Sequence, residues 1–179
     1  MTIEILAEGR FGRFVRDGSY EFVQRTGCTG VVSIVALTDT EELIFVEQYR
    51  RPVDRRTIEL VAGLVGDEVG TESLLEAARR ELLEEAGYHA RQIEPLFVGP
   101  SAGGILSSIV NYYFAWDLEQ RHNGGGVEGE GITVHHVPLK DAYEWLLEQS
   151  RTEVLVDPKV FLGIAAAERN RHRLSKAWR

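Results

Sequence analysis

Residues 66–88 read GDEVGTESLLEAARRELLEEAGY and contain the strongest helix signal in the chain. Apolar side chains recur at every fourth position of its second part, which is the spacing of one helix face. Gly87 then supplies the stop signal that commonly ends a helix. The pattern predicts a helix over residues 72–86 whose buried face carries Leu74, Ala78, Leu82 and Ala86.

The end of this helix carries three carboxylates, Glu81, Glu84 and Glu85. At about 100° per residue all three share one face, where like charges repel and the helix dipole disfavours them further. Two interpretations fit the charge geometry. The face could be solvated, with Arg80 easing the repulsion. Alternatively, a divalent cation neutralises the cluster, since hard cations bind carboxylates together with substrate phosphate oxygens.

The spacing of the fixed positions carries a family resemblance. Gly66 is followed by five residues and Glu72, then by seven residues and Arg80-Glu81-Leu82, and the segment closes on Glu84-Glu85, Gly87 and Tyr88. This arrangement is similar, position for position, to the Nudix box, the loop-helix-loop signature of the Nudix hydrolases. The resemblance extends over roughly residues 28–175, because strands and a terminal helix flank the box in the expected order.

The resemblance implies an enzyme that hydrolyses a nucleoside diphosphate linked to another group. It implies Mg²⁺ as the cofactor, and Mn²⁺ is an alternative because both ions prefer oxygen ligands. By the family pattern, Glu81 and Glu85 are metal ligands, and Glu84 is a ligand or a catalytic group beside them. Arg80 and Glu72 would orient these glutamates.

A segment before the box narrows the resemblance to one branch of the Nudix hydrolases. Residues 59–63, ELVAG, resemble an element of the ADP-ribose and nucleotide-sugar pyrophosphatases in which the alanine carbonyl is a metal ligand. This likeness assigns Ala62 to the metal site and Glu59 to the substrate site. The preceding arginines Arg50 and Arg51 become candidate substrate contacts, although their residues alone fit a solvated loop equally well.

An acidic glycine-rich loop, residues 124–130 or GGGVEGE, follows the box. It resembles the loop of the same branch that supplies a catalytic glutamate from outside the helix. Glycines beside carboxylates suit a loop that places a general base near the attacked phosphorus. Glu128 is the first candidate for the base and Glu130 for a metal contact. The two could exchange roles, and Glu84 is the third candidate base.

The loop after residue 99 departs from the branch. In relatives this loop contacts substrate, which makes Ser101, Gly103 and Gly104 candidate substrate contacts. The proline of the usual pattern is displaced here, and Ser107 or Ser108 stands where an acidic residue is common. The sequence therefore leaves the nucleobase and the sugar open.

The remaining chain predicts an α/β fold, a Nudix α/β/α sandwich with a mixed sheet. Residues 1–27 alternate polar and apolar around two turns and predict a small antiparallel β subdomain, followed by a hydrolase domain over residues 28–179. Two β-branched or apolar runs, 29–37 and 43–49, predict an antiparallel pair. Further strands are expected at 57–65, 96–98, 109–116 and 132–137, and helices at 141–149 and 158–173.

The N-terminal subdomain also predicts an assembly. It is too small to be stable alone, yet it carries apolar side chains that need cover. In ADP-ribose pyrophosphatases a similar sheet packs across a two-fold axis and both chains contribute to each substrate site. The resemblance thus implies a homodimer acting on a small nucleoside-diphosphate-sugar substrate.

Composition excludes several classes of partner. A formal charge of -8 disfavours nucleic acid and anionic membranes, and no apolar run is long enough to span a bilayer. A single cysteine, Cys28, excludes an intramolecular disulfide, and the N-terminus lacks a signal-peptide pattern, so a cytoplasmic location is expected. Two alternatives to the predicted nucleotide-sugar pyrophosphatase activity stay open. The chain could hydrolyse a dinucleotide polyphosphate or an oxidised nucleotide, or it could be a non-catalytic nucleotide sensor.

Overall fold

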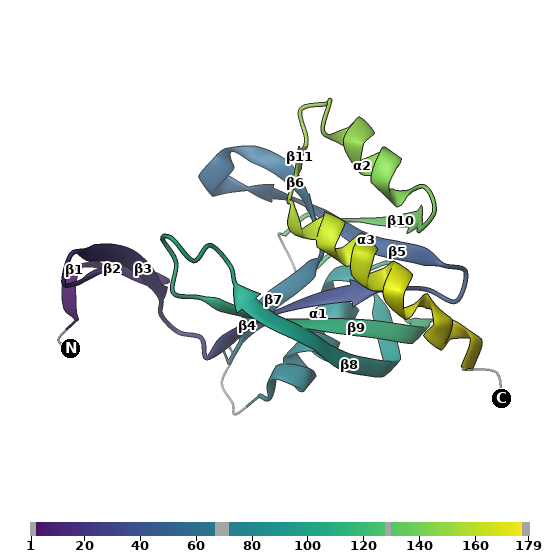
Figure 1. Cartoon of the computed structure of the whole chain (residues 1–179), viewed down its shortest axis with the longest axis horizontal. Coiled ribbons are helices and arrows are strands. Elements are labelled where there is room, and N and C mark those ends of the chain that lie inside the picture. Colours follow the sequence, from purple (N-terminus) through teal and green to yellow (C-terminus); the bar gives the residue numbers. More distant parts are fainter. Residues whose placement is uncertain (1–2, 67–71, 128–129, 177–179) are drawn as a thin grey trace.

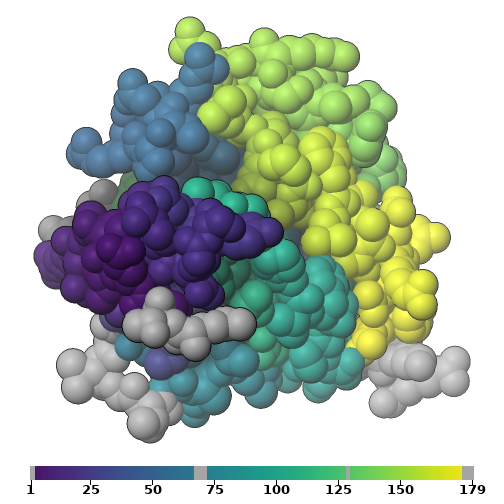
Figure 2. All heavy atoms as spheres, turned by 60° about the vertical axis from the view of Figure 1, so that its left-hand side comes forward, coloured from purple at the N-terminus to yellow at the C-terminus, as the bar shows by residue number. Residues whose placement is uncertain are grey.

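The N-terminal segment forms a separate small sheet in the computed structural model, which describes residues 3–66, 72–127 and 130–176. Its strands β1 (Glu4–Glu8), β2 (Gly12–Asp17) and β3 (Tyr20–Arg25) pair antiparallel in the order β1-β2-β3, as predicted. Strand β3 also bonds to the loop after β8, because Val23 N–H donates to the Ile105 carbonyl at 2.8 Å and Ser107 N–H to the Val23 carbonyl at 3.0 Å. Figure 2 brings this sheet forward, in purple.

The rest of the chain builds two four-stranded mixed sheets (Figure 1). One has the order β7-β4-β9-β8, with β4 and β9 parallel, and the other has the order β10-β5-β6-β11, with β6 and β11 parallel. The strands of the first sheet are β4 (Gly30–Ala36), β7 (Val61–Val65), β8 (Tyr88–Pro100) and β9 (Ile109–Gln120), and those of the second are β5 (Glu42–Arg50), β6 (Arg55–Glu59), β10 (Thr133–Pro138) and β11 (Leu155–Val156).

The predicted pairing of residues 29–37 with 43–49 is wrong. Strands β4 and β5 belong to different sheets and meet only at a single bridge between Leu37 and Leu43, beside the turn that joins them. Both strands are buried on both faces, so their apolar runs carry no alternation that could reveal a neighbour. The expected strand at 57–65 likewise divides at Leu60 into β6 and β7, one for each sheet.

Helices cover both faces of the sheets. Helix α1 (Leu74–Ala86) contacts β4, β7 and β8, and α3 (Lys159–Asn170) contacts β4, β5 and β6 with α2 (Ala142–Gln149) beside it. Short 3₁₀ turns, η1 (Arg51–Val53) and η2 (Arg171–Lys176), complete the elements. This arrangement confirms the predicted α/β/α architecture, with two mixed sheets where one was expected. Among the described residues, no helix is long and apolar enough to cross a membrane.

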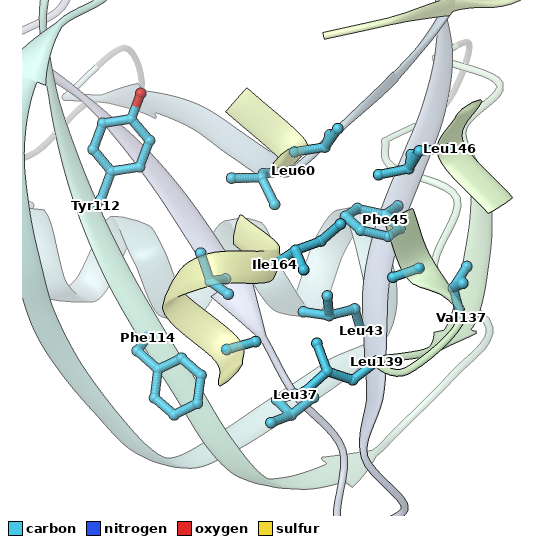
Figure 3. Close-up of a cluster of buried hydrophobic side chains, with 14 of the residues drawn as sticks. Leu37, Leu43, Phe45, Leu60, Tyr112, Phe114, Val137, Leu139, Leu146 and Ile164 are labelled. Carbon is cyan, nitrogen blue, oxygen red and sulfur yellow. The ribbon is translucent and has the colours of Figure 1, made fainter. Parts of the chain in front are cut away.

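Strand β4 separates two hydrophobic cores. Its residues Val32 and Ile34 point into the core under α1, whereas Val35 belongs to the core under α3. Figure 3 shows the second core, where Phe45 and Leu43 of β5 meet Phe114 of β9 and Ile164 of α3. The core under α1 contains Val61 and Val65 of β7 beside Ala78 and Leu82 of α1, so it holds these two elements together. The candidate site lies between them.

Candidate active site

Helix α1 begins and ends on local signals. Ser73 caps its N-terminus with a capping box, in which the Ser73 hydroxyl accepts from Glu76 N–H and the Glu76 carboxylate accepts from Ser73 N–H. Gly87 ends it with φ 81°, a left-handed conformation that favours glycine. Since both ends are fixed, the face that carries Glu81 and Glu85 is fixed as well.

A hollow of about 310 Å³ lies where this face meets the edge strand β7. Glu81 and Glu85 are both buried there, with exposed fractions of 8% and 6%. The Glu81 carboxylate lies directly against Gly63, where any Cβ would be within 1.9 Å of it, so only glycine leaves the carboxylate in place. The lining combines the carboxylates of Glu81, Glu85 and Glu130 and the guanidinium groups of Arg25 and Arg50 with Gln48, Ala62 and Gly63.

Glu85 is poised between charge states. Burial raises its pKa to about 8, and the charges of Glu81 and Glu130 add to this effect, while a hydrogen bond from Ala62 N–H at 3.1 Å opposes it. A carboxylate whose ionised form is this costly is stabilised strongly by a positive charge. The site therefore favours a bound cation.

The raised pKa gives a stability prediction for the metal-free protein. Glu85 loses its proton near pH 4.5 when unfolded and near pH 8 when folded, so the unfolded state binds fewer protons in between and stability falls as pH rises. The variant Glu85→Gln escapes this loss. In EDTA its advantage over wild type should grow by about 3 kcal/mol between pH 5 and pH 8, measured by denaturant unfolding. A pH-independent difference would contradict the raised pKa.

Arg80 makes hydrogen bonds to Glu72 and to two carboxylates of the acidic face. Its guanidinium donates to Glu72 at 2.9 Å, Glu81 at 2.8 Å and Glu84 at 3.0 Å. A fourth hydrogen bond, at 3.0 Å, reaches the Leu64 carbonyl on β7 and ties the helix to the strand. The hydrogen bonds that Arg80 donates to Glu72, together with the nearby carboxylates, raise the pKa of Arg80, so its charge is permanent. Arg80 thus holds Glu84, which does not itself line the hollow.

The donor set suits a hard divalent cation. Ala62 N–H points away from β4 toward Glu85, and the two backbone groups of a strand residue face the same side, so the Ala62 carbonyl also faces α1. Two buried carboxylates and a carbonyl are oxygen ligands of the kind Mg²⁺ prefers. Within the described ranges no three acidic, histidine or cysteine side chains already converge on one point, so substrate or water oxygens would have to complete the shell.

Arg50, like Arg25, is a cationic side chain that lines the hollow. Glu59 holds it by a two-pronged ion pair, with both hydrogen bonds at 2.7 Å, so its planar group is oriented. Glu59 therefore reaches the site through Arg50. Arg51 lies in η1 at the tip of the β5–β6 hairpin and does not line the hollow.

The glycine-rich loop is fastened to the end of α1. Gly125 N–H donates to the Glu85 carbonyl at 2.9 Å and Gly126 N–H to the Glu84 carbonyl at 3.0 Å, which satisfies carbonyls that a helix end leaves open. This attachment brings Glu130 to the lining of the hollow. Glu128 lies outside the described residues.

The loop after β8 lies apart from the carboxylates. Ser101 N–H donates to the Ser108 carbonyl at 3.0 Å and closes the loop. Gly103 and Gly104 line a separate hollow against Tyr20 and Phe22 of the N-terminal sheet. Gly103 and Gly104 therefore lie in a different hollow from Glu81 and Glu85.

Sequence reasoning missed two lining residues, Arg25 and Gln48. Gln48 lies in the stretch 47–50, EQYR, together with Arg50, so the resemblance that singled out Arg50 could have included Gln48. Arg25 ends β3, and only the folding of the N-terminal sheet brings it to the site. It also lines an adjoining polar hollow with Thr29, Ser108 and Asn111, so the two hollows share a cationic wall.

Comparisons with known proteins agree with this geometry. A family model described as the NUDIX domain matches residues 29–157. The chain is 31% identical over 121 residues to a methanol dehydrogenase activator of Bacillus methanolicus, covering 67% of this chain and 64% of that protein. It is 33% identical over 114 residues to an ADP-ribose pyrophosphatase of Bacillus subtilis (strain 168), covering 63% and 60% respectively, so the match spans less than two thirds of both relatives.

A solved structure described as an ADP compounds hydrolase superposes on the whole chain. The TM-score is 0.66 at 25% identity, and the match covers 100% of this chain and 95% of that one. The similarity therefore includes the N-terminal sheet as well as the two mixed sheets.

Proposed function

The chain belongs to the Nudix family, and from that premise we propose that it hydrolyses the pyrophosphate bond of ADP-ribose or a related nucleoside-diphosphate sugar. Water would add to one phosphorus, and the products would be a nucleoside monophosphate and a sugar phosphate. The observation that carries the proposal is the convergence of buried Glu81 and Glu85 with Arg50 and Glu130 on one hollow. A relative named ADP-ribose pyrophosphatase supports the substrate class.

Glu81, Glu85 and the Ala62 carbonyl would hold the cation, which we propose is Mg²⁺, with Mn²⁺ as the alternative. Bound there, it would neutralise the diphosphate and lower the pKa of a coordinated water. Their oxygens line one wall of the hollow, and Arg80 keeps Glu81 and Glu84 in orientation.

The other charged residues would divide the remaining work. Arg50, oriented by Glu59, would contact the diphosphate from the side opposite the carboxylates, and Arg25 would contact the substrate where the two hollows adjoin. Glu130 lines the same hollow as Glu81 and Glu85 and would take the proton of the attacking water, with Glu128 and Glu84 as alternatives. Ser101, Gly103 and Gly104 would contact the sugar or the base.

A substrate panel tests the proposal. The purified protein is incubated with Mg²⁺ and ADP-ribose, GDP-mannose, UDP-glucose, ADP-glucose or a dinucleotide polyphosphate, and monophosphate release is measured. The proposal expects ADP-ribose or another nucleotide sugar to be hydrolysed with the highest kcat/KM. Preference for the dinucleotide would reassign the substrate within the family. Binding without turnover of any compound would indicate a nucleotide sensor.

We further propose that residues 1–27 form a dimerisation subdomain beside a hydrolase domain of residues 28–179. Ile3, Ile5, Phe11 and Tyr20 of the N-terminal sheet are 43–77% exposed, an unusual apolar surface for so small an element. A second copy related by a two-fold axis would cover it. Arg50, Arg51 or the N-terminal strands of one copy would then reach the nucleotide held by the other.

Deletion of residues 1–24 should give a monomeric or poorly soluble protein with little activity, since the apolar cover and any partner contacts are lost together. Phe11→Asp should weaken the dimer in the intact chain, whereas Tyr143→Asp, which changes an exposed aromatic on α2, should not. Light scattering reports the mass. Full activity at the monomer mass of 20.1 kDa would exclude the proposed assembly.

A further inference from the structure

Arg56 on β6 lies outside the hollow but contacts the end of the loop that carries Glu130. Its Nη2 donates to the Gly131 carbonyl at 3.4 Å and to the Thr133 hydroxyl at 3.2 Å. Gly131 directly follows Glu130 and has φ 62°, so this is the turn through which the chain leaves Glu130 for β10. The contact joins residues 75 positions apart in the sequence.

The guanidinium of Arg56 is itself held in place. Its Nε pairs with the Glu47 carboxylate, and Nη2 also donates to the Glu47 carbonyl at 2.9 Å. The second carboxylate oxygen of Glu47 lies 2.9 Å from His135 Nε2. Burial alone would raise the pKa of Glu47, but the hydrogen bonds from Arg56 and His135 outweigh burial and keep its pKa below the ordinary value. The anchor is therefore charged and rigid.

This anchor rests on the hydrophobic core. The His135 ring lies 5.1 Å from the Trp145 ring, and Trp145 stacks on Phe45 at 6.1 Å, centroid to centroid. Phe45 is fully buried. A continuous chain of contacts thus runs from the core of α2 and β5, through Glu47 and Arg56, to the turn after Glu130.

Other described contacts also hold the loop. It begins on the carbonyls of α1, and Ile132 N–H donates to the Gly125 carbonyl at 3.3 Å. Glu130 itself bonds to Val127: its N–H donates to the Val127 carbonyl at 3.2 Å, and its carboxylate accepts from Val127 N–H at 3.0 Å. The Arg56 contact at Gly131 adds the tether that joins this end of the loop to β6.

We propose that Arg56, braced by Glu47 and His135, is a positioning residue that holds Glu130 toward the carboxylate pair of Glu81 and Glu85. This inference rests on the proposed function of the loop. Misplacing a reacting group by about 1 Å can cost about 100-fold in rate, so loss of one of several tethers should cost less. Substrate affinity should hardly change, because Arg56 does not line the hollow.

The test is a double-mutant cycle on kcat and KM for the best substrate of the panel. Arg56→Ala should lower kcat about tenfold and leave KM within about twofold. The kcat of Arg56→Lys should lie between those of the wild type and Arg56→Ala, since lysine can pair with Glu47 but lacks the planar guanidinium group. In a Glu130→Gln background, adding Arg56→Ala should lower kcat further by less than about twofold, because the effect of Arg56 on kcat passes through Glu130.

Two further variants keep the test decisive. Thr133→Val preserves the ion pair and the fold but removes the hydroxyl contact, and it should lower kcat about threefold. Arg91→Ala removes surface ion pairs to Asp117 and Glu119 and should leave kcat unchanged.

The possible failures are distinguishable. Equal losses from Arg56→Ala in both backgrounds, or an unchanged kcat in the wild-type background, would overturn the inference while leaving the proposed function intact. A fully active Glu130→Gln enzyme would overturn the inference together with the proposed role of Glu130.

Discussion

Glu85→Gln should reduce turnover about 1,000-fold or more at saturating Mg²⁺ while the protein stays folded. The change keeps the size of the side chain and the acceptor for Ala62 N–H, yet removes the charge that the cation requires. Loss of a metal ligand commonly costs several kcal/mol of barrier, which corresponds to at least three orders of magnitude in rate. Initial rates of monophosphate release, with thermal unfolding as the check on folding, measure the effect.

A matched control separates the site from the helix charge. Glu168→Gln removes an exposed glutamate from α3, far along the chain from the hollow, and should keep wild-type activity. Near-wild-type turnover of Glu85→Gln would refute its assignment as a ligand. Comparable losses in both variants would show that net charge, and not this carboxylate, controls the rate.

Replacing Glu128 and Glu130 together by glutamine should lower kcat by about 100-fold or more with a small change in KM. A general base contributes about 10² to 10⁴ to the rate and acts in the transition state rather than in binding. The single variants then assign the roles. The base should show the larger loss in kcat and should flatten the acidic limb of the pH–rate profile.

A small loss in the double variant would move the base back to α1. Glu84 would be the remaining candidate, because Arg80 bonds to its carboxylate as well as to that of Glu81. Glu84→Gln would then show the large loss of kcat that is otherwise expected of the loop double variant. Equal kcat in the wild type, the loop double variant and Glu84→Gln would leave the three candidate bases without a catalytic role.

Local signals in the sequence carried much of this structure. The helix predicted over residues 72–86 is observed as α1 over Leu74–Ala86, because its periodicity, its capping box and Gly87 all act within one segment. The N-terminal sheet followed from two turns and alternating residues in the same way. Placing Glu81 and Glu85 on one face needed only the helical period, whereas their burial is visible only in the structure.

The sequence did not predict contacts between segments that lie far apart along the chain. The separation of β4 and β5 into two sheets depends on which partners cover two equally apolar strands, and neither strand encodes that choice. Arg25 enters the lining because an entire sheet folds back, and Arg56 reaches Gly131 across 75 positions. No spacing rule operates over such distances. Gly63 lies in the segment 59–63 that resembles the pyrophosphatase branch. That this position has no room for a Cβ becomes visible only in the structure, where the Glu81 carboxylate lies against it.

The hollow between α1 and β7 should support pyrophosphate hydrolysis only with a bound cation. Monophosphate release from ADP-ribose is to be followed with Mg²⁺ and again after Mg²⁺ is replaced by EDTA. We expect rapid release of AMP and ribose 5-phosphate with the cation and none in EDTA, with recovery when the cation is restored. Undiminished hydrolysis in EDTA, or no hydrolysis of any nucleoside-diphosphate sugar with Mg²⁺ or Mn²⁺, would refute this assignment.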